Sequence, residues 1–401
     1  MRQGLLTILV VAFVWAALPV SVTAADGTTH FKDVNDKHWA KATIEEGVRT
    51  RIVKGYPDGT FRPSNTITRA EVASMLSSVT TLSPSSSTDA FTDLDNHWSK
   101  DAVRKLVALG FISTKDYTKG FDPNKAITRY ELMKWMATGL SVSEPSFKQA
   151  LTDVKDTLLP TPESFKGGIT KDQVPYIALV RGTSIVNGFP DGSFKPEATA
   201  TRAEVLTMML RYAQVEGTKA EEYRDLQEMI GVSLEGTNML QLTDDVRYVK
   251  NSLTVNELSK KTISLPSADL VIHRMIFVDA KTSEYKGVYA KLFTDGQNEW
   301  PDEYMVFQEA TLTLKSEKFD AKTRLRIQGE INKYGSAFSL NSFRGAVDNK
   351  QIVPALPRSN SVETVKKEIP YTFWTPHTFK AQHDSYDTLK INGELFAYGI
   401  W

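Results

Sequence analysis

Residues 55–63 read Gly-Tyr-Pro-Asp-Gly-Thr-Phe-Arg-Pro, and residues 67–71 read Ile-Thr-Arg-Ala-Glu. The first stretch returns at residues 188–196 as Gly-Phe-Pro-Asp-Gly-Ser-Phe-Lys-Pro. The pattern Thr-Arg-x-Glu returns at residues 128–131 and 201–204. Ordered self-similarity of this kind is the signature of a repeat architecture, in which each unit is one supersecondary structure. The sequence therefore predicts three repeats in the N-terminal half of the chain.

Two further motifs recur in the same order. Phe-Lys-Asp-Val at residues 31–34 is matched at residues 91–94 and 151–154, with a spacing of 60 residues each time. His-Trp at residues 38–39 returns at residues 97–98 and has no counterpart in the third copy. The third copy is also longer, and we place its extra residues at 158–170. The expected repeats span residues 28–82, 88–142 and 148–216.

Each repeat has the pattern of two helices joined by a turn. Ala40, Ile44, Val48 and Ile52 recur at steps of four residues, which predicts an apolar stripe on a first helix. Pro-Asp-Gly is typical of a turn. Thr-x-x-Glu is a capping box that opens a second helix. A two-helix unit cannot bury its own apolar faces, so the three repeats should pack together as one body.

The capping box puts Arg69, Arg129 and Arg202 at the first position of their second helices. Free backbone N–H groups and the positive end of the helix dipole favour an anion there. A guanidinium adds a planar fork that suits a carboxylate or a phosphate. Three such sites would suit a repetitive anionic polymer. The alternative, equally open on chemistry alone, is that each arginine pairs with a neighbouring acid such as Glu71 or Asp33.

Trp39 and Trp98 stand at the start of the first helix in the first two repeats. Their rings could stack on the faces of sugars. Aromatic residues at helix starts are more often packing anchors, so the sequence leaves both interpretations open.

Taken together, these motifs resemble the S-layer homology (SLH) domain family over about residues 28–216. The resemblance implies an all-α bundle in which three repeats are related by pseudo-threefold symmetry. It also implies non-covalent anchoring to a secondary cell-wall polysaccharide that carries ketal-linked pyruvate, and it admits self-assembly in a surface layer. No cofactor is implied. By motif match, the ligand-binding residues are Asp33, Trp39, Arg69, Asp93, Trp98, Arg129, Asp153 and Arg202.

The sequence departs from the family pattern in two repeats. The second carries Lys-Gly-Phe-Asp-Pro at residues 119–123 in place of the Gly-Tyr-Pro-Asp-Gly turn, and it has Tyr130 where the others have alanine. In the third repeat, counting back from the turn puts Asp172 in the place of Trp39. We therefore expect at least one groove between repeats to be altered or silent.

The composition excludes several classes of protein. The 401 residues include 48 Lys+Arg and 48 Asp+Glu, so the formal net charge is zero. That balance argues against a nucleic-acid binder and against a polybasic membrane-surface protein. Cysteine is absent, which excludes disulfides, thiolate metal sites and a cysteine nucleophile.

The N-terminus has the pattern of a secretory signal at residues 1–24. A basic start is followed by an apolar run at residues 5–18 and by Val-Thr-Ala at residues 22–24. The run is shorter than the roughly 20 residues of a membrane span. An uncleaved N-terminal anchor is the alternative. We expect an exported protein of the cell wall or cell surface, with no membrane span after cleavage.

The C-terminal half has a different pattern. Residues 217–235 form a charged, helical connector, and residues 236–401 are predicted to form a mainly-β domain, a sandwich or a barrel. Asn-Gly within residues 389–396 is typical of a two-residue hairpin. The other strand candidates are residues 271–278, 288–293, 311–314 and 325–329.

We find no nucleophile elbow, phosphate loop or zinc helix in this half, and so expect no catalytic residues and no metal. The expected role is a displayed binding or structural module. The alternative is a wall-tethered glycan hydrolase that uses the acidic cluster Glu299, Asp302 and Glu303, because paired carboxylates can hydrolyse glycosides. His377 and His383 could together hold a metal, although loop histidines are more often plain surface residues.

Overall fold

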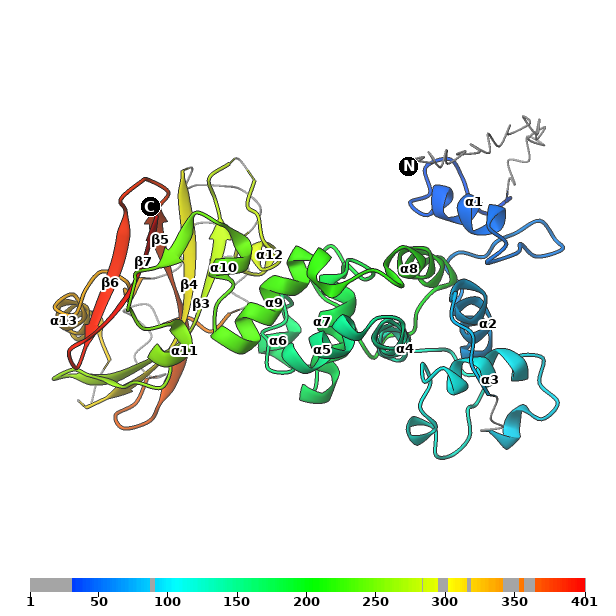
Figure 1. The fold of residues 1–401 in the computed structure, drawn as a ribbon, viewed down its shortest axis with the longest axis horizontal. Coiled ribbons are helices and arrows are strands. Elements are labelled where there is room, and N and C mark those ends of the chain that lie inside the picture. Colours follow the sequence, from blue (N-terminus) through cyan, green and yellow to red (C-terminus); the bar gives the residue numbers. More distant parts are fainter. Residues whose placement is uncertain are drawn as a thin grey trace, which may run out of the picture.

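The structure is a computed structural model that describes residues 31–86, 91–282, 284–294, 302–315, 319–341, 353–356 and 365–400. A helical N-terminal part is followed by two antiparallel sheets (Figure 1). The expected order of helices first and strands later is confirmed. The predicted signal at residues 1–24 lies outside the described residues. Within the described ranges, no helix is both long and apolar enough to span a membrane.

Each repeat contains two main helices, and the predicted capping box is present at the start of every second helix. The predicted first helix ends at Arg49, before Ile52, because Arg51 takes a left-handed φ of 62°. The helix pairs are α1 (Lys41–Arg49) with α2 (Arg69–Val79), α3 (Lys100–Ala108) with α4 (Arg129–Ser143), and α7 (Val174–Gly182) with α8 (Arg202–Val215). Short 3₁₀ turns lie at η1 (Thr92–Leu94), η2 (Thr114–Asp116) and η3 (Lys171–Gln173).

The repeats interlock in a cycle at the starts of their second helices. There, the first two backbone N–H groups of each helix donate to carbonyls in the loop before the second helix of the next repeat. The donor–acceptor pairs are Arg69–Lys125 and Ala70–Pro123, Arg129–Ala198 and Tyr130–Pro196, and Arg202–Asn65 and Ala203–Pro63. The first repeat thus contacts the second, the second contacts the third, and the third returns to the first.

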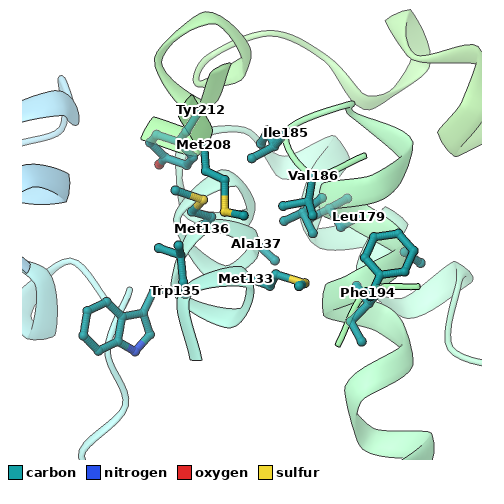
Figure 2. Packing of buried hydrophobic residues seen from close by; sticks show 14 of the residues in the cluster. Met133, Trp135, Met136, Ala137, Leu179, Ile185, Val186, Phe194, Met208 and Tyr212 are labelled. Carbon is teal, nitrogen blue, oxygen red and sulfur yellow. The ribbon is translucent and has the colours of Figure 1, made fainter. Parts of the chain in front are cut away.

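A shared apolar core lies beneath this ring of contacts. Figure 2 shows Met133 and Met136 of α4 beside Val186 and Met208 of the third repeat. All four side chains are at most 5% exposed. The repeats therefore bury their apolar faces against one another, as expected of units too small to have a core of their own.

Additional helices surround the third repeat. α5 (Pro145–Asp153) and α6 (Glu163–Lys166) precede α7, and η4 (Ala220–Glu222) leads into α9 (Arg224–Glu235). The connector is thus helical, as predicted. α10 (Met239–Leu242) and α11 (Val255–Leu258) follow it and lead into the sheets.

The C-terminal half contains two antiparallel sheets. One has the order β2-β3-β4-β5 and the other the order β1-β7-β6. The strands are β1 (Val246–Tyr248), β2 (Ile263–Ser264), β3 (Ala268–Asp279), β4 (Glu303–Leu314), β5 (Tyr371–Lys380), β6 (Tyr386–Ile391) and β7 (Glu394–Ile400). Both sheets contribute to one buried cluster, with Phe277 and Phe373 from the first and Phe396 and Tyr398 from the second.

Some strand predictions are confirmed and two are wrong. The 389–396 hairpin is present, and its turn residues Asn392 and Gly393 both have positive φ. Residues 271–278 and 311–314 lie in β3 and β4. Residues 288–293, however, contain the helix α12 (Ala290–Phe293), and residues 325–329 lie in α13 (Ala321–Ile331). An alternation of only three apolar positions does not distinguish a strand from a helix.

Candidate binding site on the repeats

Arg69 is buried and fully paired. Its side chain donates from Nε and Nη2 to Glu131 Oε1 at 2.9 and 2.6 Å, and from Nη1 to the Phe121 carbonyl at 2.8 Å. The guanidinium also lies 4.9 Å from the centre of the Tyr117 ring. With only 7% of Arg69 exposed, these contacts close the junction between the first and second repeats.

Arg129 makes the equivalent contacts between the second and third repeats. Its Nε donates to the Phe194 carbonyl at 2.8 Å, and Nη1 donates to Glu204 Oε1 at 3.4 Å. The guanidinium lies 4.5 Å from the Phe189 ring centre. Burial lowers the pKa of Arg129, and the nearby Glu204 carboxylate opposes that shift.

Arg202 closes the cycle back to the first repeat, but it is less well paired. Its Nη2 donates to the Lys54 carbonyl at 2.7 Å, while Nη1 stands 3.9 Å from Glu71 Oε1. The guanidinium lies near the rings of Tyr56 and Phe61, 5.2 and 4.9 Å from their centres. Its Nε is buried and has no hydrogen-bond partner in the part of the chain that the structure describes. This junction therefore holds an unused cationic donor.

These contacts show what the helix starts and their arginines bind within the chain, while binding of an anion by the arginines stays a prediction. The backbone N–H groups at the helix starts are not free, because carbonyls of the next repeat and the capping threonine accept from them. Each arginine instead faces an acid, as the alternative predicted. That acid belongs to the Thr-Arg-x-Glu motif of the next repeat. Of the two acids proposed for this role, Glu71 faces Arg202, whereas Asp33 accepts from backbone N–H groups.

Asp33 and Asp93 hold the turns of their own repeats. The Asp33 carboxylate accepts from the backbone N–H groups of Phe61 and Arg62 at 2.8 and 2.7 Å. Asp93 accepts in the same way from the backbone N–H groups of Phe121 and Asp122, at 3.2 and 2.7 Å. Arg62 has a left-handed φ of 59°, so the carboxylate fixes a strained backbone position.

Asp153 was expected to be equivalent to Asp33, and this expectation is wrong. Asp153 ends α5, and its carboxylate accepts from Gln149 Nε2 at 2.8 Å. In the third repeat, Glu163 takes the turn position instead: its Oε1 accepts from the N–H groups of Phe194 and Lys195 at 2.9 and 3.0 Å. Motif matching missed Glu163 because the extra residues displaced the acid and replaced it with a longer one.

The turn of the first repeat carries further charge close to Arg202. Asp58 accepts from Thr60 and from Arg62, and these bonds lower the pKa of Asp58 to about 2. Arg62 also lies over the Tyr56 ring, 3.9 Å from its centre. The turn therefore neutralises its own charges and leaves Arg202 as the less well paired cation beside Tyr56.

Trp39 and Trp98 are exposed at equivalent positions. Each stands two residues before its first helix, with 65% and 64% of its surface exposed. The ring of the preceding histidine lies 5.9 Å away in the first repeat and 5.4 Å away in the second. Neither tryptophan is a packing anchor. Asp172 holds the same position before α7, as the count along the sequence predicted.

The C-terminal candidates are not brought together as a metal site. His377 pairs with Asp387, with 2.7 Å between Nε2 and Oδ2, while His383 lies beside Asp384. No group of three or more metal-ligating side chains occurs among the residues whose placement is described. In the acidic cluster, Glu299 lies outside those residues, and Glu303 begins β4.

Comparisons with known proteins agree with the motifs. The model of the S-layer homology domain matches residues 30–73, 90–133 and 168–206. The chain is 38% identical over 109 residues to the cellulosome-anchoring protein of Acetivibrio thermocellus, an alignment that covers 25% of this chain and 24% of that protein. It is 26% identical over 247 residues to the S-layer protein sap of Bacillus anthracis, covering 61% and 27%.

A third relative has the name of an enzyme and not of a surface-layer or anchoring protein. The chain is 27% identical over 180 residues to Exoglucanase XynX of Acetivibrio thermocellus, covering 45% of this chain and 16% of the relative. Each of these three alignments thus spans between 16% and 27% of the relative's length. The N-terminal half of the chain carries three tandem S-layer homology repeats, and the chain is a secreted protein of the cell wall or cell surface.

Proposed function

We propose that the repeats anchor the protein non-covalently to a pyruvylated secondary cell-wall polysaccharide and that the C-terminal domain is displayed as a binding or structural module. The observation that carries this proposal is the pair of exposed indoles, Trp39 and Trp98. Large apolar rings are normally buried, and a flat exposed ring suits the apolar face of a sugar. Two rings at equivalent positions suit a ligand that itself repeats.

The pyruvyl carboxylate needs a cation, and the three junctions differ in what they offer. Arg69 and Arg129 would have to break buried pairs before they could bind an anion. The Nε of Arg202 has no hydrogen-bond partner among the described residues, and its nearest carboxylate oxygen, on Glu71, is 3.9 Å from Nη1. Of the three arginines, we therefore assign Arg202 as the main contact of the pyruvyl carboxylate. Asp33 and Asp93 act in this proposal by holding the turns beside these junctions.

Two finer features of the fold belong to the same proposal. The cycle of backbone contacts, from each repeat to the next and back to the first, supports a pseudo-threefold bundle. The cluster shared by the two sheets supports a β-sandwich. The division of the chain at residues 216 and 217 stays a prediction. So does a surface lattice, which two-dimensional arrays in electron micrographs would test.

Co-sedimentation of the chain with purified cell walls tests the anchoring. Binding should disappear once the polysaccharide is chemically removed. The double variant Trp39→Ala/Trp98→Ala should bind at least about tenfold more weakly, since each stacked ring contributes on the order of 1 kcal/mol. Tyr386→Ala is the matched control, because Tyr386 is 62% exposed on β6 of the C-terminal half. Equal binding by the double variant and the control would reject the site.

A wall-tethered glycan hydrolase is the second candidate. One observation favours it: Glu303 Oε2 is buried and finds no hydrogen-bond partner among the described residues. Its acid-cluster neighbour Asp302 has a left-handed φ of 68°. A glycan-hydrolysis assay on the whole chain, with Glu303→Gln beside it, separates the two functions. Turnover that the substitution abolishes would establish the hydrolase, and no turnover would leave the display function.

A further inference from the structure

The first helix of the third repeat, α7, buries more of its residues than the first helices of the other two repeats, α1 and α3. In α1 the buried residues are Ile44 and Gly47, and in α3 they are Val103 and Leu106. Both helices have one apolar side, as expected at a protein surface. The buried residues of α7 are Ile177, Ala178, Leu179, Val180 and Gly182. A short helix buried in this way must be covered on more than one side.

Besides helices α4 and α5, the connector helix α9 also packs against α7. A Cβ atom on Gly182 would lie 2.7 Å from the Leu226 Cα and 3.0 Å from the Leu226 backbone nitrogen. The residues at the same place, the last of α1 and of α3, are Arg49 and Ala108. In the third repeat the backbone of α9 comes too close for a side chain at this place, whereas Arg49 is exposed and Ala108 is half-buried.

The segment that leads into the extra residues of the third repeat binds the same connector. Thr157 Oγ1 donates to the Met229 carbonyl at 2.7 Å, and the Asp156 N–H donates to the Ser233 hydroxyl at 3.2 Å. From the C-terminal half, the Tyr289 hydroxyl donates to the Leu158 carbonyl at 2.9 Å. These residues therefore contact both the connector and the C-terminal domain.

Apolar packing follows the same path into the sheet. Trp374 of β5 is 1% exposed and lies edge-on to Phe165 of α6, with ring centres 6.1 Å apart. It also packs on Phe293, whose ring stacks on Phe307 of β4 at 4.3 Å. One continuous buried cluster runs from the repeats into β3, β4 and β5. In Figure 1, α5, α6, α7 and α9 lie between the other repeat helices and the sheets.

The far side of α9 is fixed to β3. Glu228 is completely buried, and its Oε2 accepts from Asn238 Nδ2 at 3.0 Å and from the Val288 N–H at 3.1 Å. The Asn238 amide in turn bonds both the N–H and the carbonyl of Phe277. The connector is thus held by the third repeat on one side and by the sheet on the other.

We propose that the third repeat is a rigid mount for the C-terminal domain, which holds that domain in one orientation relative to the first two repeats. This contact uses a surface of α7 that corresponds to the less buried sides of α1 and α3 among the described residues. The mount does not depend on what the repeats bind. If the proposed wall anchoring is correct, the C-terminal domain has a fixed direction relative to the wall.

Distance measurements between spin labels test this directly. The chain has no cysteine, so Asp101→Cys and Asp244→Cys would supply its only thiols, at side chains that are 97% and 99% exposed. A second pair, Asp36→Cys and Asp101→Cys, lies within the repeats. The width of its distance distribution is the reference for two labels on one rigid body. We expect the pair across the two halves to give a single distance distribution of similar width. A distribution several times broader would overturn the mount.

A wedge variant tests the contact itself. Gly182→Leu should push α9 away from α7 and broaden the distribution across the two halves, while Ala108→Leu, at the same place in α3, should not. Circular dichroism would show whether the helices and strands are intact in both variants. A folded Gly182→Leu chain that keeps the narrow distribution would overturn the proposal. If the wedge prevents folding, the width measured in the otherwise unchanged chain decides alone.

Discussion

Glu163 accepts in the third repeat the same two backbone N–H bonds that Asp33 accepts in the first. Asp33 lies 28 residues before the first of its donors, and Glu163 lies 31 residues before the corresponding donor. The third repeat therefore keeps the same carboxylate contact, but a glutamate makes it in place of an aspartate and from a different position in the chain. Lys195, the second donor, has a left-handed φ of 47°, so this turn needs the support.

Shortening this side chain should destabilise the third repeat. Glu163→Asp should lower the free energy of unfolding by about 1–3 kcal/mol, because the carboxylate no longer reaches the N–H groups of Phe194 and Lys195. Asp153→Asn is the matched control and should change it by less than about 0.5 kcal/mol, since the bond that its carboxylate accepts from Gln149 is exposed to solvent. Urea unfolding curves measure both. The reverse ranking would restore Asp153 to the turn position.

Arg202 should matter for binding and less for folding. Arg202→Ala should weaken sedimentation with pyruvylated walls about tenfold or more, the effect of losing a charge-assisted hydrogen bond. Arg49→Ala, which removes an exposed arginine of the same repeat body, should leave binding unchanged. Binding isotherms on walls with and without the polysaccharide give the comparison. Unchanged affinity for Arg202→Ala would remove this residue from the site.

Arg69 should behave in the opposite way. Arg69→Ala removes the guanidinium that donates to Glu131 and to the Phe121 carbonyl at a closed junction, so the free energy of unfolding should fall by roughly 2–3 kcal/mol. Thermal unfolding and wall binding should be measured on the same preparation. Wall binding of the folded fraction should stay near that of the parent chain. A large loss of binding at full stability would show that this buried pair opens for the ligand.

Glu228 should make stability depend on pH. Burial raises the pKa of its carboxyl to about 7, although the bonds from Asn238 and Val288 oppose the shift, as does Arg224; Asp225 adds to it. The folded chain therefore holds this proton where the unfolded chain releases it. The contribution of the protonated Glu228 carboxyl to the free energy of unfolding is fully present below its ordinary pKa of 4.5. As the pH rises to 7, this contribution declines by about 3 kcal/mol.

Glu228→Gln removes that charge and keeps an acceptor. The variant should be more stable than the parent chain at pH 8 and similar to it at pH 4.5, and its stability should vary less between these values. Glu235→Gln, at an exposed position of the same helix, is the control. Chemical unfolding at several pH values measures the slope. If the free energy of unfolding changes with pH equally in the parent chain and in Glu228→Gln, the buried carboxyl does not titrate in this range.

Much of the local structure could be predicted because its determinants lie within a few residues of one another. The three capping boxes need only a threonine and a glutamate three residues apart, and all three are present. The Asn392-Gly393 hairpin likewise depends on two adjacent residues that tolerate positive φ. Residues 325–329 show the limit, because an alternation that short also fits α13, which Asp320 caps by accepting from the Thr323 N–H.

The sequence by itself determined that there are three repeats, where their second helices begin, and that a β-rich half follows. Only the tertiary structure decided the partners of the key side chains. Arg69 meets an acid 62 residues away, and Arg202 meets a carbonyl 148 residues away. Gly182 has its role only because α9 folds back against it. Helix starts and tight turns are set by interactions between near neighbours in the chain. Pairing and burial depend on packing between distant segments, which a local pattern does not encode.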